Sequence, residues 1–100
     1  VPDQLLLRLG RVIRRQREEL KVSQEEFADA HGINRTHYGA IERGRQNLTV
    51  MNLARVATGL GRSPSLLFRE AERLDLDKAL KEPPRPPRRG RPAGAKSRWG

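Results

Sequence analysis

The 100-residue chain has no cysteine, four aromatic residues and no apolar run long enough to cross a membrane. Without cysteine it can hold neither a disulfide framework nor a cysteine-ligated zinc site. A membrane helix needs about 20 apolar residues, and the opening segment VPDQLLLRLG is a short leucine run without the layout of a signal peptide. We therefore expect a soluble, cytoplasmic protein with no membrane contact and a small, mostly aliphatic core.

Positive charge, in contrast, is in excess, with a formal net charge of +9. Residues 82–100 hold six Lys or Arg and one Glu, a net charge of +5, whereas residues 1–81 carry a net charge of only +4. A surplus of this size favours a polyanionic partner such as double-stranded DNA, which would place the protein at the nucleoid. The alternative is a solvated cationic surface without a partner.

Apolar residues recur every three or four positions in five stretches, as in amphipathic helices. The first runs from about residue 4 to 20, and the last opens at Ser63-Pro64, since proline is favoured at a first helical position. Leu74, Leu76 and Leu80 either extend the last helix or form a short sixth turn. Residues 1–81 are thus predicted to form one all-α, five-helix domain. Residues 82–100, with five of the seven prolines, are predicted to be a disordered or extended basic tail.

The middle of the chain has the spacing of two short helices joined by a tight turn. Ser23 and Glu26 stand three residues apart, which is the spacing of a capping box at a helix start. Gly32 can adopt the left-handed conformation that ends this helix. Asn34 can then cap a third helix over about residues 35–43. This layout predicts a helix-turn-helix, in which the second helix enters the DNA major groove.

The second helix of this motif is expected to divide into an inner and an outer face. Ile33, Tyr38 and Ile41 are predicted to anchor it to the core. The residues left on the outer face are Arg35, Thr36, His37, Gly39 and Ala40. An arginine can bind guanine through two hydrogen bonds, and a threonine offers a hydroxyl to base edges and a methyl to thymine. Gly39 and Ala40 are expected to keep the surface low enough for DNA to approach.

These residues give the chain a specific resemblance. Residues 9–68 resemble the Cro/C1-type (XRE family) helix-turn-helix regulators, and the stretch NRTHYGAIERGRQNLTVMNL is most similar to the controller proteins of restriction-modification systems. The resemblance rests on Ser23-Gln24-Glu25-Glu26, Gly32, Ile41-Glu42-Arg43-Gly44, Asn47 and Asn52-Leu53. It implies a lambda-repressor-like DNA-binding domain. His37 is a departure, because controller-like sequences usually have an aromatic residue there; here the aromatic follows as Tyr38.

The resemblance also implies roles for single residues. Gln24 is expected to contact a phosphate, while Arg35 and Thr36 are expected to read bases. Arg17 is expected to pair with Glu42, chiefly as a structural pair that could lend Arg17 to a nearby phosphate. The residues in and after the turn that follows are expected to approach the DNA backbone of the same half-site: Arg43, Arg45, Gln46 and Asn47. Asn34 and His37 are also expected to contact DNA.

Two further candidates lie outside the motif. Leu66, Leu67 and Phe68 form an apolar stripe at the end of a small core and are a candidate dimer interface. In the tail, Arg89-Gly90-Arg91 is similar to the core of an AT-hook, whose arginines enter the minor groove. A generic phosphate-binding tail is the favoured alternative for this segment.

The sequence therefore predicts a bacterial or phage-like transcription regulator, such as a repressor or controller protein. It is expected to bind an inverted-repeat operator as a homodimer and to regulate its own promoter. The alternative is an antitoxin-type protein that binds a protein partner as well as DNA. An enzyme is not expected, since no cysteine nucleophile or glycine-rich phosphate loop is present. No cofactor is expected and no metal either, because His31 and His37 lie on different elements without a third ligand.

Overall fold

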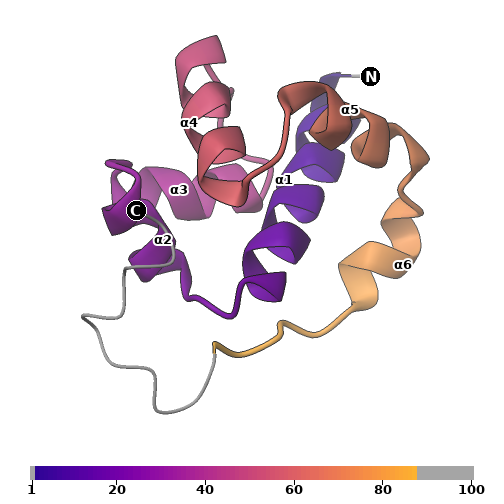
Figure 1. Cartoon of the computed structure of the whole chain (residues 1–100). Helices are drawn as coiled ribbons and strands as arrows, with labels where there is room; N and C mark the ends of the chain where they lie inside the picture. Colours follow the sequence, from indigo (N-terminus) through magenta and orange to yellow (C-terminus); the bar gives the residue numbers. More distant parts are fainter. Residues whose placement is uncertain (1, 88–100) are drawn as a thin grey trace.

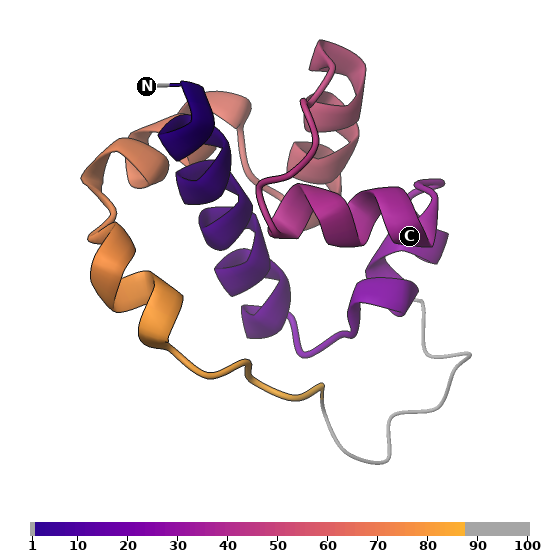
Figure 2. The ribbon, with the colours of Figure 1, turned by 180° about the vertical axis from the view of Figure 1, so that it is seen from behind.

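This computed structural model describes residues 2–87 of the chain. They form six α-helices, of which the first is surrounded by the other five (Figures 1 and 2). They are α1 (Pro2–Glu19), α2 (Gln24–Ala30), α3 (Arg35–Glu42), α4 (Val50–Leu60), α5 (Pro64–Arg73) and α6 (Leu76–Lys81). No strand occurs within residues 2–87. The predicted all-α class is confirmed, and of the two alternatives for the end of the domain the structure shows a short sixth helix.

Helix α1 runs through the middle of the molecule and contacts α3, α4, α5 and α6. In both views α2, α3 and α4 lie on one side of α1, and α5 and α6 lie on the other (Figures 1 and 2). Leu9, Val12 and Ile13 of this helix are buried, each at most 3% exposed, whereas Leu5 near its start is 40% exposed. α1 is therefore the shared support for the two halves of the fold.

The position of α3 against α1 depends on Gly10. A Cβ atom at this residue would lie 2.5 Å from the carbonyl oxygen of Ile41 and 2.7 Å from that of Glu42. Backbone atoms of another helix cannot give way to such a contact as a flexible side chain could. Because Gly10 has no side chain, α1 and α3 can pack in close contact, and this contact fixes the position of α3 relative to α1.

Side chains cap the starts of α2, α3 and α4. The Ser23 hydroxyl accepts a hydrogen bond from the Glu26 amide, and the Glu26 carboxylate accepts one from the Ser23 amide, both at 3.0 Å. Asn34 caps α3 and Thr49 caps α4 in the same way, each through a 3.0 Å bond to the amide three residues on. Such caps stabilise a helix by about 1 kcal/mol each. They matter most for α2, which has only seven residues.

After α6 the chain continues as an extended segment that passes the C-terminal end of α1 (Figure 1). Residues 83–87 belong to no helix.

Candidate nucleic-acid interface

Helices α2 and α3 form a helix-turn-helix that is anchored from its inner side. The turn is closed by the Ile33 amide, which donates to the Ala28 carbonyl at 2.9 Å, and Gly32 has a φ of +67°, a value that glycine adopts without strain. Phe27 and Tyr38 are fully buried, with ring centroids 5.1 Å apart. Because both helices are fixed by their inner residues, the first turn of α3 stands at a defined place on the surface.

Arg17 of α1 and Glu42 of α3 form a buried ion pair behind this surface. The Arg17 guanidinium donates to the Glu42 carboxylate at 2.6 and 3.1 Å and to the Val22 carbonyl at 2.7 Å. Burial disfavours the charge of Arg17, but the hydrogen bonds and charge of Glu42 outweigh it, so the pKa of Arg17 is raised. The predicted pair is thus confirmed. A buried arginine with this many acceptors locks α1 to the end of α3.

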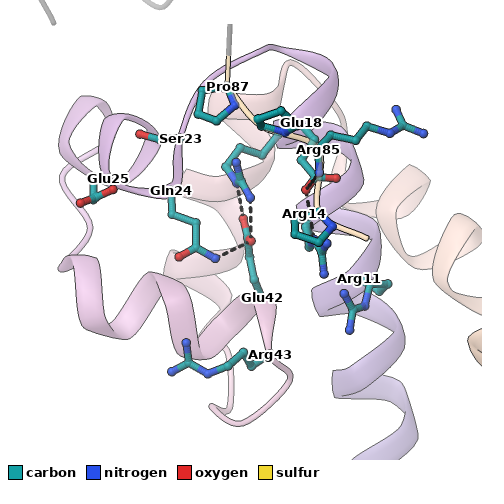
Figure 3. Close-up of a pocket in the computed structure, with 13 residues that line it drawn as sticks. Arg11, Arg14, Glu18, Ser23, Gln24, Glu25, Glu42, Arg43, Arg85 and Pro87 are labelled. Carbon is teal, nitrogen blue, oxygen red and sulfur yellow. Dashed lines mark hydrogen bonds and ion pairs between the residues drawn. The ribbon is translucent and has the colours of Figure 1, made fainter. Parts of the chain in front are cut away.

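Gln24, the first residue of α2, is tied to the same carboxylate. Its side-chain nitrogen donates to Glu42 at 2.8 Å, and Figure 3 shows the amide turned toward Glu42. An amide nitrogen carries two hydrogens, so one more donor remains for a ligand at the start of α2. The side chain expected to contact a phosphate is therefore held in place by the network that fixes α3.

Arg35, at the start of α3, is paired with Asp29 of α2. The guanidinium donates to the Asp29 carboxylate at 3.0 Å from Nε and 2.6 Å from Nη2. These hydrogen bonds and the charge of Asp29 raise the pKa of Arg35. Both side chains are more than half exposed, so the pair lies on the surface and not in the core. It holds the extended arginine in one orientation beside the turn.

The other predicted residues of this turn differ in what they do. Thr36 is exposed, and the Asn34 side chain is occupied as the cap of α3, through its bond to the His37 amide. The ring of His37 is half-buried and its Nε2 lies 3.1 Å from the side-chain nitrogen of Asn52 in α4. His37 therefore joins α3 to α4.

The segment after α3 presents four polar side chains to the surface. Its turn is closed by the Arg45 amide, which donates to the Ala40 carbonyl at 3.0 Å. The exposed residues are those expected to approach the DNA backbone: Arg43, Arg45, Gln46 and Asn47. These four residues directly follow α3 in the chain, which agrees with the expectation that they contact the same half-site as α3.

Two residues expected on the outer face of α3 are buried instead. Gly39 is covered by the side chains of Arg43 and Gln24, which lie 3.2 and 3.5 Å from where its Cβ would be. Ala40 is only 9% exposed. The exposed part of α3 is thus narrower than the helical spacing predicts, and it is concentrated in its first turn.

The candidate dimer stripe on α5 is also divided. Leu66 and Phe68 are each 37% exposed, but Leu67 is fully buried in the hydrophobic core. Neighbouring positions on a helix point about 100° apart, so three consecutive residues cannot share one exposed face. Leu67 is therefore a core residue, which corrects its predicted place in an interface. The tail candidates Arg89, Gly90 and Arg91 lie outside the described residues.

Within residues 2–87, no group of three or more His, Asp or Glu side chains is placed to hold a metal ion. In the same part of the chain, no helix has the length and apolar character required to span a bilayer.

A helix-turn-helix anchored on α1, with an exposed basic first turn on its second helix, defines a DNA-binding regulator. A family model described as "Helix-turn-helix" matches residues 13–67, more than half of the chain. The protein belongs to this Cro/C1-type (XRE) helix-turn-helix family, which is a family of DNA-binding regulators and not of enzymes.

The protein is similar to controller proteins of restriction-modification systems. The control protein C.MunI of Mycoplasma sp is 35% identical over 72 residues, which cover 71% of this chain and 97% of that protein. The crystal structure of the restriction-modification controller protein C.AhdI from Aeromonas hydrophila matches with a TM-score of 0.60 and 34% identity, over 62% of this chain and 94% of that one. The crystal structure of a tyrosine-to-phenylalanine mutant of the restriction-modification controller protein C.Esp1396I matches with a TM-score of 0.61 and 30% identity, over 79% and 95% of the two chains.

Proposed function

We propose that the protein is a sequence-specific transcription regulator that binds an inverted-repeat operator as a homodimer. The observation that carries the proposal is the exposed first turn of α3, where Arg35 and Thr36 project from a helix that the Arg17–Glu42 pair fixes to the core. In helix-turn-helix proteins the N-terminal residues of this helix contact base edges. Gln24 and residues 43–47 are available to contact the phosphates of the same half-site.

Energetics favour a dimer over a monomer. A good bidentate contact discriminates against the wrong base by about 1–3 kcal/mol. Specific sites are typically bound about 4–10 kcal/mol more tightly than random DNA. The first turn of α3 offers one arginine and one threonine, so a single copy supplies too little discrimination. A second copy related by a two-fold axis would double the contacts and match a palindromic operator.

The exposed apolar side chains of α5 are the surface that we assign to this dimer. Leu66 and Phe68 are partly exposed, while Leu67 between them is buried and fixes α5 to the core. The two side chains lie about 200° apart around the helix, on the two flanks of the buried Leu67, so the proposed self-complementary interface extends over both flanks of α5. Regulation of its own promoter is proposed from the similarity to proteins named restriction-modification controllers.

The decisive experiment is a selection of bound sequences from random duplex DNA at about 150 mM salt, where non-specific phosphate binding is suppressed. We expect an enriched site with two-fold symmetry. Enrichment of A-tracts without symmetry would assign DNA binding to the arginine-rich tail instead. No enrichment, together with a small protein that co-purifies, would favour the antitoxin-type function.

The dimer itself is tested by sedimentation without DNA at tens of micromolar protein. The wild type is expected to sediment as a dimer, and a Leu66→Glu/Phe68→Glu variant as a monomer. The matched control is Met51→Glu, which places the same charge at another exposed apolar residue, on α4. A monomeric wild type, or an unchanged dimer in the double variant, would contradict the assigned interface.

A further inference from the structure

The segment that follows α6 is attached to α1 by two polar contacts. The Arg15 guanidinium donates to the Glu82 carboxylate at 2.5 and 3.2 Å. Three residues on, the backbone amide of Arg85 donates to the carboxylate of Glu18 at 2.9 Å. Glu18 is only 5% exposed and also accepts from Arg14 at 3.1 Å. The segment therefore satisfies a carboxylate that lies almost wholly out of solvent.

Proline content makes this attachment specific. Proline has no N–H, so Arg85 supplies the single peptide donor within residues 83–87, and the structure directs that donor at Glu18. Prolines also restrict both themselves and the residue before them to extended conformations. Residues 82–87, which we call the strap, thus form a stiff segment with one defined register along α1.

The strap completes a groove beside the start of α2 (Figure 3). The groove has a volume of about 490 Å³ and is lined by strap residues, by Gln24 and by five arginines against three glutamates. Two of those arginines are held in the ion pairs Arg17–Glu42 and Arg14–Glu18. The other arginines that line the groove are Arg11, Arg43 and Arg85, and the one remaining glutamate of its lining is Glu25.

The charge of the strap indicates what the groove accepts. The one acidic residue of the strap, Glu82, contacts Arg15 and does not line this groove. A segment that blocked a DNA-binding surface would bring negative charge to it, whereas the strap brings Arg85. Because Gln24 lines the same groove, the anion that fits is a phosphate of the DNA backbone at the edge of the half-site.

We propose that the strap and α1 together form a phosphate-binding groove, with Arg11, Arg43 and Arg85, for the DNA backbone that flanks the sequence read by α3. The proposal rests on the proposed function and adds a contact to it. In the solved controller structures the match covers 62% and 79% of this chain and nearly all of theirs, so this chain has residues without a counterpart in either.

Attachment of the strap is tested first, in the full chain without DNA. Hydrogen exchange measured by NMR should show the Arg85 amide protected, because it is bonded to a buried carboxylate. An Arg85 amide that exchanges at the rate of an unstructured peptide would show that the strap is not attached, and the proposal would fail.

The phosphate contact is tested with Arg85→Ala, which removes the guanidinium but keeps the backbone N–H that attaches the strap. On duplex DNA the slope of log K against log salt becomes shallower by about 0.9 for each phosphate that the protein no longer neutralises. We expect a change of that size for Arg85→Ala and none for the matched control Arg73→Ala, an exposed arginine on α5. The slope is measured on a random duplex and on the selected site.

Ethylation interference on the selected site locates the contact. Wild type should be sensitive to ethylation of a phosphate outside the outermost base read by α3, and Arg85→Ala should lose that sensitivity alone. If Arg85→Ala keeps the wild-type slope and interference pattern, the groove holds no phosphate, although sequence-specific binding stands. If instead no site is selected at all, the proposed function fails, and the slope on random duplex still decides whether the groove binds the DNA backbone.

Discussion

Asp29 and Arg35 face each other across the turn of the helix-turn-helix and share two hydrogen bonds, of 3.0 and 2.6 Å. As an exposed pair they contribute little to folding. Their geometry instead bears on recognition, because an arginine has many rotamers and an immobilised one has fewer to lose on binding. Nε and one Nη2 hydrogen are bonded to Asp29, which leaves Nη1 directed away from the carboxylate.

We predict that Asp29→Ala lowers sequence selectivity. Immobilising a flexible side chain costs about 0.5–1.5 kcal/mol, so the ratio of specific to random affinity should fall roughly two- to tenfold. Binding to random DNA should not weaken, because a negative charge is removed near the phosphates. Competition between labelled operator and random duplex measures the ratio. The control is Glu19→Ala, which removes an exposed acid at the C-terminal end of α1 and should leave this affinity ratio unchanged.

Arg35→Ala should weaken binding to the selected site by about 1–3 kcal/mol and relax the preference at one base position. Affinity for random duplex should change much less, since a base contact is made only at the correct sequence. Repeating the selection with the variant identifies the position. Equal losses on specific and random DNA would show that Arg35 contacts a phosphate, and the assigned role would be wrong.

Features set by local spacing were predictable from the sequence. Ser23 with Glu26, and Asn34 with His37, act within one helical turn, so the caps and the turn between them needed no tertiary information. The Arg17–Glu42 pair spans 25 residues, and only the resemblance to a family suggested it.

The features that the sequence did not predict depend on how two helices pack against each other. Asp29 lies six residues before Arg35. Asp29 and Arg35 lie on either side of the predicted turn, but the angle between α2 and α3 decides whether their side chains come into contact. Gly39 was misplaced for a related reason, because helical spacing gives a direction but not the neighbouring side chains that fill it.

The buried carboxylate of Glu42 gives a stability prediction. Glu42→Gln leaves the guanidinium of Arg17 buried without a counter-charge, and breaking such a pair typically costs about 3–5 kcal/mol. Urea unfolding should show a loss of this size. The double variant Arg17→Met/Glu42→Leu should recover most of the stability, because replacing both partners with apolar residues is often neutral. It should still bind DNA more weakly than wild type, since Gln24 loses the acceptor that orients it. Full DNA affinity in the double variant would show that the network has only a structural role.

Stability is expected to decrease in mild acid through His31. Burial lowers the pKa of His31 below its ordinary value of 6.5, while its ring packs 4.6 Å from that of Phe27. A base with a lower pKa in the folded state binds protons more readily when unfolded, so stability is complete above about pH 6.5 and falls as the pH decreases toward the folded pKa. Urea midpoints at pH 7.5 and 5.5 measure the effect, and His31→Leu should reduce the difference. An NMR titration that gives His31 a pKa of 6.5 or more would contradict the assignment.

Gly10→Ala separates helix propensity from packing by the sign of its effect. Alanine is favoured over glycine inside a helix by about 1 kcal/mol, so propensity alone predicts a more stable protein. The added Cβ, however, would lie 2.5 Å from the backbone oxygen of Ile41, and overpacking of this kind costs about 1–3 kcal/mol. We expect net destabilisation in thermal unfolding, together with weaker operator binding, because α3 must move away from α1. The exposed α4 substitution Thr58→Ala serves as the propensity control and should stabilise slightly. If Gly10→Ala is more stable than wild type and binds DNA with unchanged affinity, the close contact between α1 and α3 does not set the position of α3.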